Sequence, residues 1–251
     1  MNSRERVLKA INYKKPDKIP VDFGSHRSSG IMAMAYARLK EELGIDTGNI
    51  YVYDMIQQLA IIEPEVLKRF GIDTIELGRG FLTNDSDWKD WVLPDGTPCK
   101  IPYYINLKKE GEDWIMVNNK GKELGRQKKD CLYFEQTHYP WADIDFENSD
   151  FKEMENIFEE CMWTAVPHPG AHFPLDYEGC NTLAEGAKNL RNFTDKAILG
   201  IFGGAMFEVP QYLVGSENFF MYLAMYPEAT HRFLEKLCSI HERNMEKFSD
   251  P

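Results

Sequence analysis

The 251 residues, of which 43% are hydrophobic and 13% aromatic, suffice to bury a core in one large α/β domain or two small ones, which excludes a disordered chain. The excess of 40 acidic over 29 basic residues gives a formal charge of −11, which repels a nucleic-acid backbone and an anionic membrane surface. The charged N-terminus lacks the apolar core of a signal peptide, and no apolar run reaches the roughly 20 residues of a membrane span. We therefore expect a cytoplasmic protein with no nucleic-acid or membrane partner.

The first elements predicted along the chain are a helix, a strand and a second helix. Ser3 is expected to cap a helix over residues 4–12, with Val7, Leu8, Ala10 and Ile11 inward. Residues 19–24 form a short β-branched and aromatic run that ends on glycine, which predicts a buried parallel strand. Residues 28–44 have a serine cap, good helix formers and a terminal glycine, which together predict a helix.

Strand and helix signals continue to alternate through most of the remaining chain. A helix over 61–71 leads into a second buried strand at 72–78, and a third strand over 196–208 runs into a Gly-Gly turn. Further helices are expected at 150–165, 182–192, 209–213 with an extension, and 227–248. This order of strand, helix and strand predicts a parallel sheet.

The texture changes between residues 84 and 136, where aromatic and β-branched runs alternate with turn-forming stretches. This pattern predicts a β-meander inserted into the α/β unit. Its aromatic side chains either pack their own small sheet or cover the mouth of a barrel. They are Trp88, Trp91, Tyr103, Tyr104, Trp114, Tyr133 and Phe134.

The repeated α/β units predict a (β/α)8 barrel of the TIM type, of which residues 1–251 form the N-terminal part of a single domain. Such a barrel needs eight strands, and the sequence offers about three besides the insertion. The chain stops directly after a predicted helix, where a further strand is expected. We therefore expect the missing strands to come from sequence beyond residue 251 or from another chain.

Three segments resemble the uroporphyrinogen decarboxylase superfamily, whose members are barrels of this kind. They are RERVLKAINYKKPDKIPVDFG, EVLKRFGIDTIELG and ILGIFGGAMFEVPQYLVGSENFFMYLAMYPEATHRFLEKL. The decarboxylase branch carries an arginine-rich loop after its first strand and an aspartate after its second, whereas this chain has only Arg27 in GSHRSSG and Gly80 at the aspartate position. A polyanionic porphyrinogen needs several guanidinium partners and an acceptor for its NH groups, so these differences argue against that substrate.

The resemblance instead favours the cobamide-dependent methyltransferase branch. It implies transfer of a methyl group between a methylcobamide, carried by a corrinoid protein, and a small donor or acceptor. In members that use thiols, zinc is bound by a His-x-Cys motif and a later cysteine, and such ligands would lie beyond residue 251. Uroporphyrinogen decarboxylation and a non-catalytic tetrapyrrole-binding or assembly fragment remain alternatives, and exposed barrel edges leave a homodimer open.

Candidate site residues follow from the rule that barrel enzymes work at the carboxyl ends of their strands. His26 and Glu208 are the candidate proton-transfer groups, although His26 also suits an ordinary surface role and Glu208 also suits a helix N-terminus. Arg79 suits a substrate carboxylate or phosphate as well as an ion pair with Glu76. The candidate substrate-binding residues are Asp22, Ser25, Glu76, Arg79, Gly203, Gly204 and Phe207.

Cysteine and histidine usage gives only a weak metal signal. The five cysteines are far apart, odd in number and without a CxxC pair, so we expect free buried thiols rather than disulfides or a zinc knuckle. His168, His172 and Cys180 are the one group of ligand-type residues close in sequence. Because Pro169 and Gly170 prevent a helical turn between the two histidines, a loop without metal is the favoured interpretation.

Overall fold

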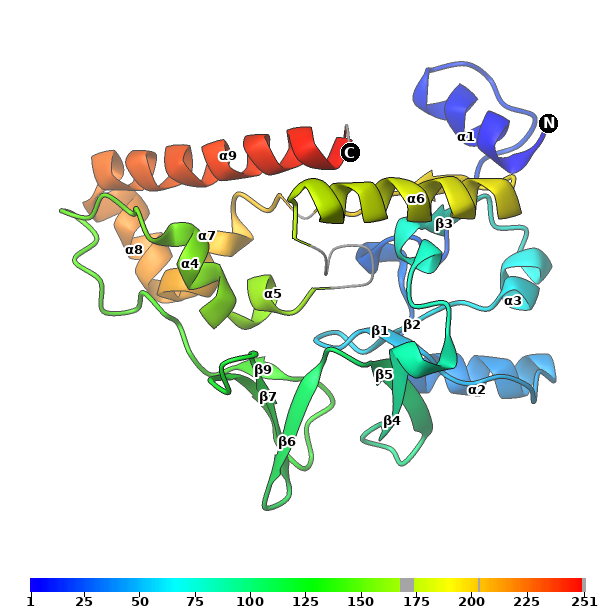
Figure 1. The fold of residues 1–251 in the computed structure, drawn as a ribbon, viewed down its shortest axis with the longest axis horizontal. Coiled ribbons are helices and arrows are strands. Elements are labelled where there is room, and N and C mark those ends of the chain that lie inside the picture. The colour runs from blue at the N-terminus through cyan, green and yellow to red at the C-terminus, as the bar shows by residue number, and fades with distance from the viewer. Residues whose placement is uncertain (168–173, 203, 250–251) are drawn as a thin grey trace. The chain divides into compact units, whose positions relative to one another are not determined.

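A computed structural model of the protein describes residues 1–167, 174–202 and 204–249 and has a mixed α/β fold (Figure 1). The chain divides into two compact units. The first unit comprises Met1–Tyr104 and His168–Ile201, and the second comprises Ile105–Pro167 and Phe202–Pro251. Among the described residues, no helix combines the length and apolar character that crossing a bilayer requires.

The first unit contains short strands and the long helix α6. Its elements are α1 (Ser3–Ile11), η1 (Arg27–Ser29), α2 (Ala33–Leu43), β1 (Val52–Asp54), β2 (Leu59–Ala60), α3 (Pro64–Arg69), β3 (Thr74–Glu76), η2 (Leu77–Gly80), η3 (Asp85–Asp87), β4 (Trp88–Val92), β5 (Pro98–Pro102), α6 (Tyr177–Phe193) and β10 (Ala197–Leu199). Strands β3 and β10 pair in parallel, with Thr74 opposite Ala197 and Glu76 opposite Leu199. The pairs β1–β2 and β4–β5 are antiparallel.

The second unit combines a four-stranded antiparallel sheet with helices. Its elements are β6 (Asn106–Glu110), β7 (Asp113–Val117), β8 (Glu123–Gln127), β9 (Glu135–Gln136), α4 (Met154–Ile157), η4 (Phe158–Glu160), α5 (Met162–Ala165), α7 (Glu208–Val214), α8 (Ser216–Met225) and α9 (Pro227–Ser249). The strand order is β6-β7-β8-β9. Helix α9 buries Phe233, Leu237 and Ile240, which recur at helical spacing. The Phe233 ring meets those of Phe146 and Phe151 at centroid distances of 5.5 and 4.9 Å in an aromatic core.

The parallel β3–β10 pair confirms an α/β fold, but the predicted barrel is not confirmed. Within the described ranges, the largest sheet has four strands and none closes. The prediction of a strand at 19–24 is wrong. Ile19 is 82% exposed, and a single backbone hydrogen bond, from Asp73 N to Val21 O at 2.8 Å, joins this stretch to the residue before β3. Pro20 has no N–H, and the Asp73 carboxylate accepts the N–H of Val21 at 3.0 Å, so a ladder cannot extend.

The first two helices form, but details of both predictions are wrong. Asn2, not Ser3, caps α1. The buried face of α1 carries Arg6, while Leu8 and Ile11 are 49% and 64% exposed. Helix α2 starts only at Ala33, because the predicted serine cap lies in η1, whereas Gly44 ends it in the left-handed conformation as predicted.

Other boundaries also differ from the predictions. The helix predicted at 150–165 is broken into α4, η4 and α5, since Cys161 is extended between the last two. Gly215, with φ of +88°, separates α7 from α8 where one extended helix was expected. The predicted meander forms, although its strands belong to two sheets, and the β1–β2 hairpin was not predicted. All five cysteines are free, of which Cys99 and Cys161 are buried.

Candidate active site at the end of strand β3

Polar side chains gather in the first unit where strand β3 ends. Thr74 and Glu76 are two residues apart on β3 and are both buried, so they share one face of the strand. Thr74 Oγ1 donates to Asp22 Oδ1 at 2.6 Å, and the buried Ser25 Oγ lies 2.9 Å from Thr74 Oγ1 and also contacts Asp22. Partial burial opposes ionisation of Asp22, but hydrogen bonds from Ser25, Ser29 and Thr74 lower its pKa. Asp22 therefore holds the loop after Val21 against the strand as a carboxylate.

A buried ion pair joins this loop to the β1–β2 hairpin. Arg27 Nε lies 2.6 Å from Asp54 Oδ2, and the Asp54 side chain is 1% exposed. The other oxygen of Asp54 accepts the N–H of Gln57 at 2.9 Å, which fixes the turn that follows β1. The positive charge of Arg27 is therefore largely neutralised by the buried Asp54 carboxylate.

Glu76 carries the most functionally suggestive pKa in the cluster. Its side chain is almost fully buried, and this desolvation raises its pKa to about 7, against the opposing effects of the Gly78 N–H and the charges of Arg79 and Arg27. A carboxyl group with this pKa changes its charge near neutral pH. Buried titratable groups of this kind are enriched at functional sites.

Several uncharged polar atoms lie in or beside the same region. Burial and the negative charges of Asp54 and Glu76 raise the pKa of Tyr53, which therefore stays neutral. Among the described residues, the Tyr53 hydroxyl and both amide atoms of Gln58 have no hydrogen-bond partner. Gln58 is fully buried and has a φ of +53°, an uncommon conformation for a residue with a side chain. Buried polar atoms normally have a hydrogen-bond partner. Because these atoms have none within the described protein, they can bind water or a ligand.

A small open pocket lies beside this cluster, and we call it the Arg79 pocket. Its volume is about 280 Å³. The guanidinium of Arg79, which lines this pocket, interacts electrostatically with the carboxyl group of Glu76. One wall is formed by Tyr51 and Trp88, whose rings meet edge to face at 4.8 Å, and Trp88 Nε1 donates to Leu82 O at 2.8 Å. The remaining lining residues are Ile61, Phe81, Leu82, Thr83, Asn84 and Asp85.

Five of the predicted site residues lie in the first unit: Asp22, Ser25, His26, Glu76 and Arg79. His26 is exposed, and its Nδ1 accepts the N–H of Ser28 at 3.1 Å, so it acts as a cap for η1. This geometry matches the ordinary surface role rather than proton transfer.

Apart from Cys180 in α6, the other candidates belong to the second unit or lie outside the described residues. Phe207 packs on Phe219 and Phe220 at about 6 Å, Glu208 begins α7 on the surface, and Gly204 is exposed. Gly203, His168 and His172 lie outside the described residues, while Cys180 is half-buried in α6. Within the described ranges no three His, Cys, Asp or Glu side chains converge on a metal site.

Sequence reasoning missed Tyr53, Asp54 and Gln58, and it left Arg27 outside the candidate site. The run Tyr51–Asp54 has the aromatic and β-branched composition of a strand end, but it lies between the helices predicted at 28–44 and 61–71, in a stretch to which we assigned no element. From the meander, Trp88 contributes to the wall of the Arg79 pocket.

The structure leaves no room for a side chain at position 80. A Cβ atom on Gly80 would approach Gly186 O of α6 to 2.6 Å. Helix α6 crosses η2 too closely for any side chain there.

No family model matches this chain, and no curated protein or solved structure is significantly similar to it.

Proposed function

We propose that this protein is a methyltransferase of corrinoid-dependent one-carbon metabolism. Its small substrate, the methyl donor or acceptor, binds in the Arg79 pocket, and the second substrate is a methylcobamide carried by a corrinoid protein. The observation that supports the proposal is the Arg79 pocket of about 280 Å³, which places a guanidinium next to a carboxyl group with a pKa of about 7. The parallel β3–β10 pair is, in this proposal, part of a (β/α)8-type barrel whose strand ends carry the site.

Size and charge both favour a small substrate over a porphyrinogen. The pocket lies just below the range of roughly 300–1,000 Å³ that is usual for drug-sized ligands. Arg27 is already paired with Asp54, so Arg79 is the guanidinium that is left for an anion in the cluster. Several carboxylates on one macrocycle would need more cationic partners than this.

The residues of the chain perform two tasks in this proposal. Arg79 orients the substrate through one anionic group, while Tyr51 and Trp88 shield one side of it from water. Glu76 sets the local charge: when neutral, it leaves the positive charge of Arg79 uncompensated, and when ionised, it reduces the attraction of the site for an anion.

Methyl transfer can be measured with methylcob(III)alamin and a simple thiol that carries one anionic group, by the loss of alkylcobalamin absorbance and by mass spectrometry of the thioether. The variant Arg79→Met removes a charge-assisted contact of about 1.5–3 kcal/mol, so kcat/KM for the anionic thiol should fall about 10- to 100-fold. Most of that loss should appear in KM, and a neutral thiol should be affected much less.

The control is Arg38→Met, which removes the same charge from a side chain that is 75% exposed on α2 and lies outside the pocket. It should leave the kinetics unchanged. Transfer to neither type of thiol, or equal rates in Arg79→Met and the unaltered protein, would overturn the proposal. Release of carbon dioxide from uroporphyrinogen would favour the decarboxylase alternative instead.

A further inference from the structure

A second and larger pocket, of about 480 Å³, lies in the first unit at the amino ends of β3 and β10. These are the strand ends opposite to the ones that carry Glu76 and Arg79. Residues from α1, α3, α6 and the segments that lead into both strands form its wall. We call it the lysine pocket. It is independent of the Arg79 pocket and of the function proposed for it, since no residue lines both pockets.

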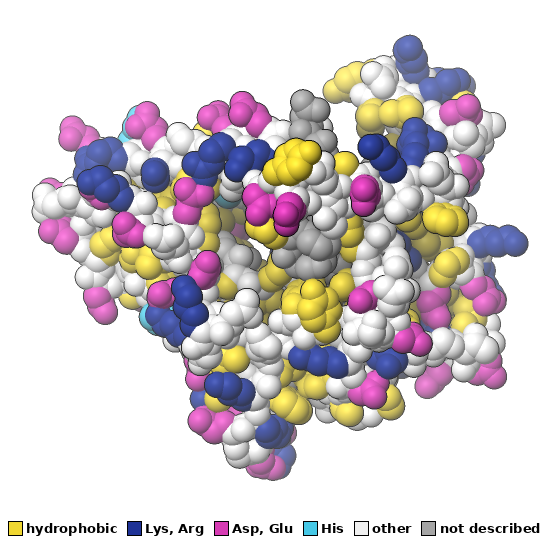
Figure 2. All heavy atoms as spheres, in the orientation of Figure 1, with side chains coloured by type: hydrophobic (Ala, Val, Ile, Leu, Met, Phe, Trp, Pro, Cys, Tyr) yellow, Lys and Arg dark blue, Asp and Glu magenta, His cyan; other side chains and the backbone are white. Residues whose placement is uncertain are grey.

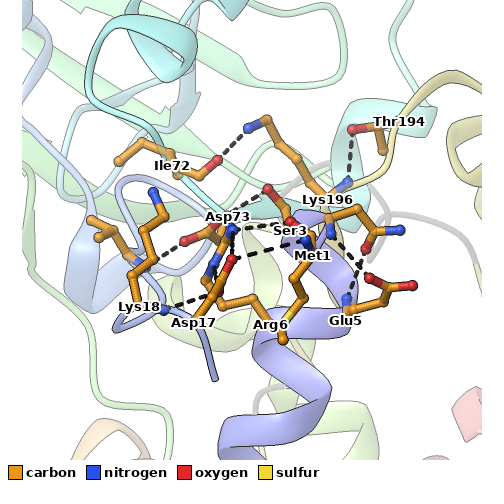
Figure 3. A network of polar contacts seen from close by, with 12 residues as sticks. Met1, Ser3, Glu5, Arg6, Asp17, Lys18, Ile72, Asp73, Thr194 and Lys196 are labelled. Carbon is orange, nitrogen blue, oxygen red and sulfur yellow. Dashed lines mark hydrogen bonds and ion pairs between the residues drawn. The ribbon is translucent and has the colours of Figure 1, made fainter. Parts of the chain in front are cut away.

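The acidic groups near the lysine pocket are already neutralised. Arg6 Nε lies 2.7 Å from Asp17 Oδ1, and another nitrogen of the same guanidinium contacts Asp73 (Figure 3). Asp73 also accepts hydrogen bonds from Ser3 Oγ at 2.8 Å and from Val21 N at 3.0 Å. Burial opposes ionisation of Asp73, but these partners lower its pKa, so it stays a carboxylate bound to Arg6. The N-terminal ammonium, whose nitrogen lies 4.0 Å from Asp17 Oδ2, is the second cation beside these two carboxylates.

Three lysines add positive charge to the wall of this pocket. Lys196 donates its ammonium to Ile72 O, as Figure 3 shows, and Lys18 and Lys68 also line the pocket. In the part of the chain that the structure describes, no carboxylate forms an ion pair with any of the three. Gly71 has a φ of +64°, and a Cβ there would lie 3.5 Å from Lys18 Nζ, so the ammonium lies close to this turn. Such a concentration of positive charge is notable on a chain of net charge −11.

Apart from Ser3 and Thr194, the rest of the wall is apolar. Leu67 and Leu190 are buried at 2% and 9% exposure, and Ile75 is half-buried beside them. Phe193, at the end of α6, is 88% exposed. A pocket with an apolar wall and a few convergent charged groups has the general composition of a small-molecule site.

We propose that the lysine pocket is a second ligand-binding site, for a small organic phosphate that carries an apolar group. Ammonium groups bind phosphate as point charges, and three of them suit its double negative charge better than a single carboxylate. The apolar part of the ligand packs on Phe193 and the leucines. The volume is within the range of small-molecule sites.

The proposal is tested by calorimetric titration of the protein with phenyl phosphate at low ionic strength. We expect saturable binding of one equivalent, weaker binding of benzoate and inorganic phosphate, and none of phenol. The double variant Lys18→Gln/Lys68→Gln should weaken phenyl phosphate binding at least tenfold. Phe193→Ala, at an exposed position, should weaken the binding of phenyl phosphate but not of inorganic phosphate.

The matched control is Lys14→Gln/Lys15→Gln, which removes the same charge from exposed lysines outside the pocket and should leave the affinity within about twofold. Arg79→Met should also bind phenyl phosphate normally, which separates this site from the Arg79 pocket. Thermal unfolding of each variant checks that it is folded. Undetectable binding at millimolar phenyl phosphate, or equal affinity in Lys18→Gln/Lys68→Gln and the unaltered protein, would overturn the proposal.

Discussion

Glu76 concentrates the physical chemistry of the candidate site in one side chain. It ends strand β3 in a buried position, where water cannot solvate its charge, and its pKa rises to about 7. The neighbouring Arg79 and Arg27 favour ionisation but do not overcome the loss of solvation. Glu76 therefore carries a cost in stability at neutral and alkaline pH, as residues at functional sites often do.

The sign of this cost gives a prediction for Glu76→Gln. The pKa of an unfolded glutamate is about 4.3, so the stability that neutral Glu76 contributes is full below that pH and is lost as the pH rises through about 7. Glutamine stays neutral throughout. We compare the free energies of unfolding of Glu76→Gln and the unaltered protein by chemical denaturation. The value for Glu76→Gln minus that for the unaltered protein should rise by roughly 1–3 kcal/mol from pH 4.5 to pH 8.

The exposed Glu65→Gln on α3 is the control and should show no such gain with pH. A constant offset between Glu76→Gln and the unaltered protein across the range would mean that Glu76 has an ordinary pKa.

The contact between α6 and η2 shows how two elements define the Arg79 pocket. Gly80 of η2 faces Gly186 of α6, and a Cβ on Gly186 would come within 2.4 Å of the Phe81 ring. Phe81 is also a wall of the pocket. The close approach of the two elements therefore positions a side chain that shapes the candidate site.

Replacing Gly186 with alanine should consequently destabilise the protein. In an exposed helix this change gains about 1 kcal/mol, but here the ring of Phe81 must move, and overpacking of this kind costs about 1–3 kcal/mol. We expect a net loss of roughly 1–2 kcal/mol in chemical denaturation, together with weaker binding of the anionic thiol. Glu185→Ala, at the exposed neighbouring position, should be neutral or slightly stabilising. A stability gain in Gly186→Ala would show that α6 and η2 are less closely packed.

At the scale of the whole molecule, charge is the dominant property. The space-filling view in Figure 2 shows acidic and basic side chains interspersed over the visible face. The acidic excess nevertheless leaves a net charge of −11, and the isoelectric point is about 5.1. The lysine pocket is a local exception to this net charge.

The net charge predicts a solubility minimum close to pH 5, because intermolecular repulsion vanishes at the isoelectric point. Precipitation in ammonium sulfate at pH values from 4 to 8 measures it. Solubility should increase steadily from pH 5.5 to 8. A minimum near neutral pH would instead mean that the acidic excess is offset by bound cations.

Sequence patterns that span a few residues predicted helix ends and one strand correctly. Gly44 ends α2 in the predicted conformation, Pro227 begins α9, and the run before Glu76 forms a strand that pairs in parallel with β10. Each of these features depends on backbone preferences over a few residues. The composition of residues 19–24 is equally strand-like, yet Asp73, some 50 residues later, takes the N–H of Val21 that a ladder would need.

The sequence also predicted only those parts of the candidate site that follow from local patterns. Glu76 and Arg79 were found because they follow a recognisable strand, whereas the Arg27–Asp54 pair joins residues whose separation in sequence carries no periodic signal. His26 was a reasonable candidate by position, but the structure uses it as a cap.

By itself, the sequence determined the α/β character, most helix positions, the acidic surface charge and the location of Glu76 and Arg79 after a strand. These features follow from composition and from interactions between residues near one another in the chain. Only the tertiary structure decided which carboxylates are buried or paired, that α6 crosses η2 at two glycines, and that three lysines line one pocket. Those outcomes depend on desolvation and on contacts between distant segments, which no local pattern of residues encodes.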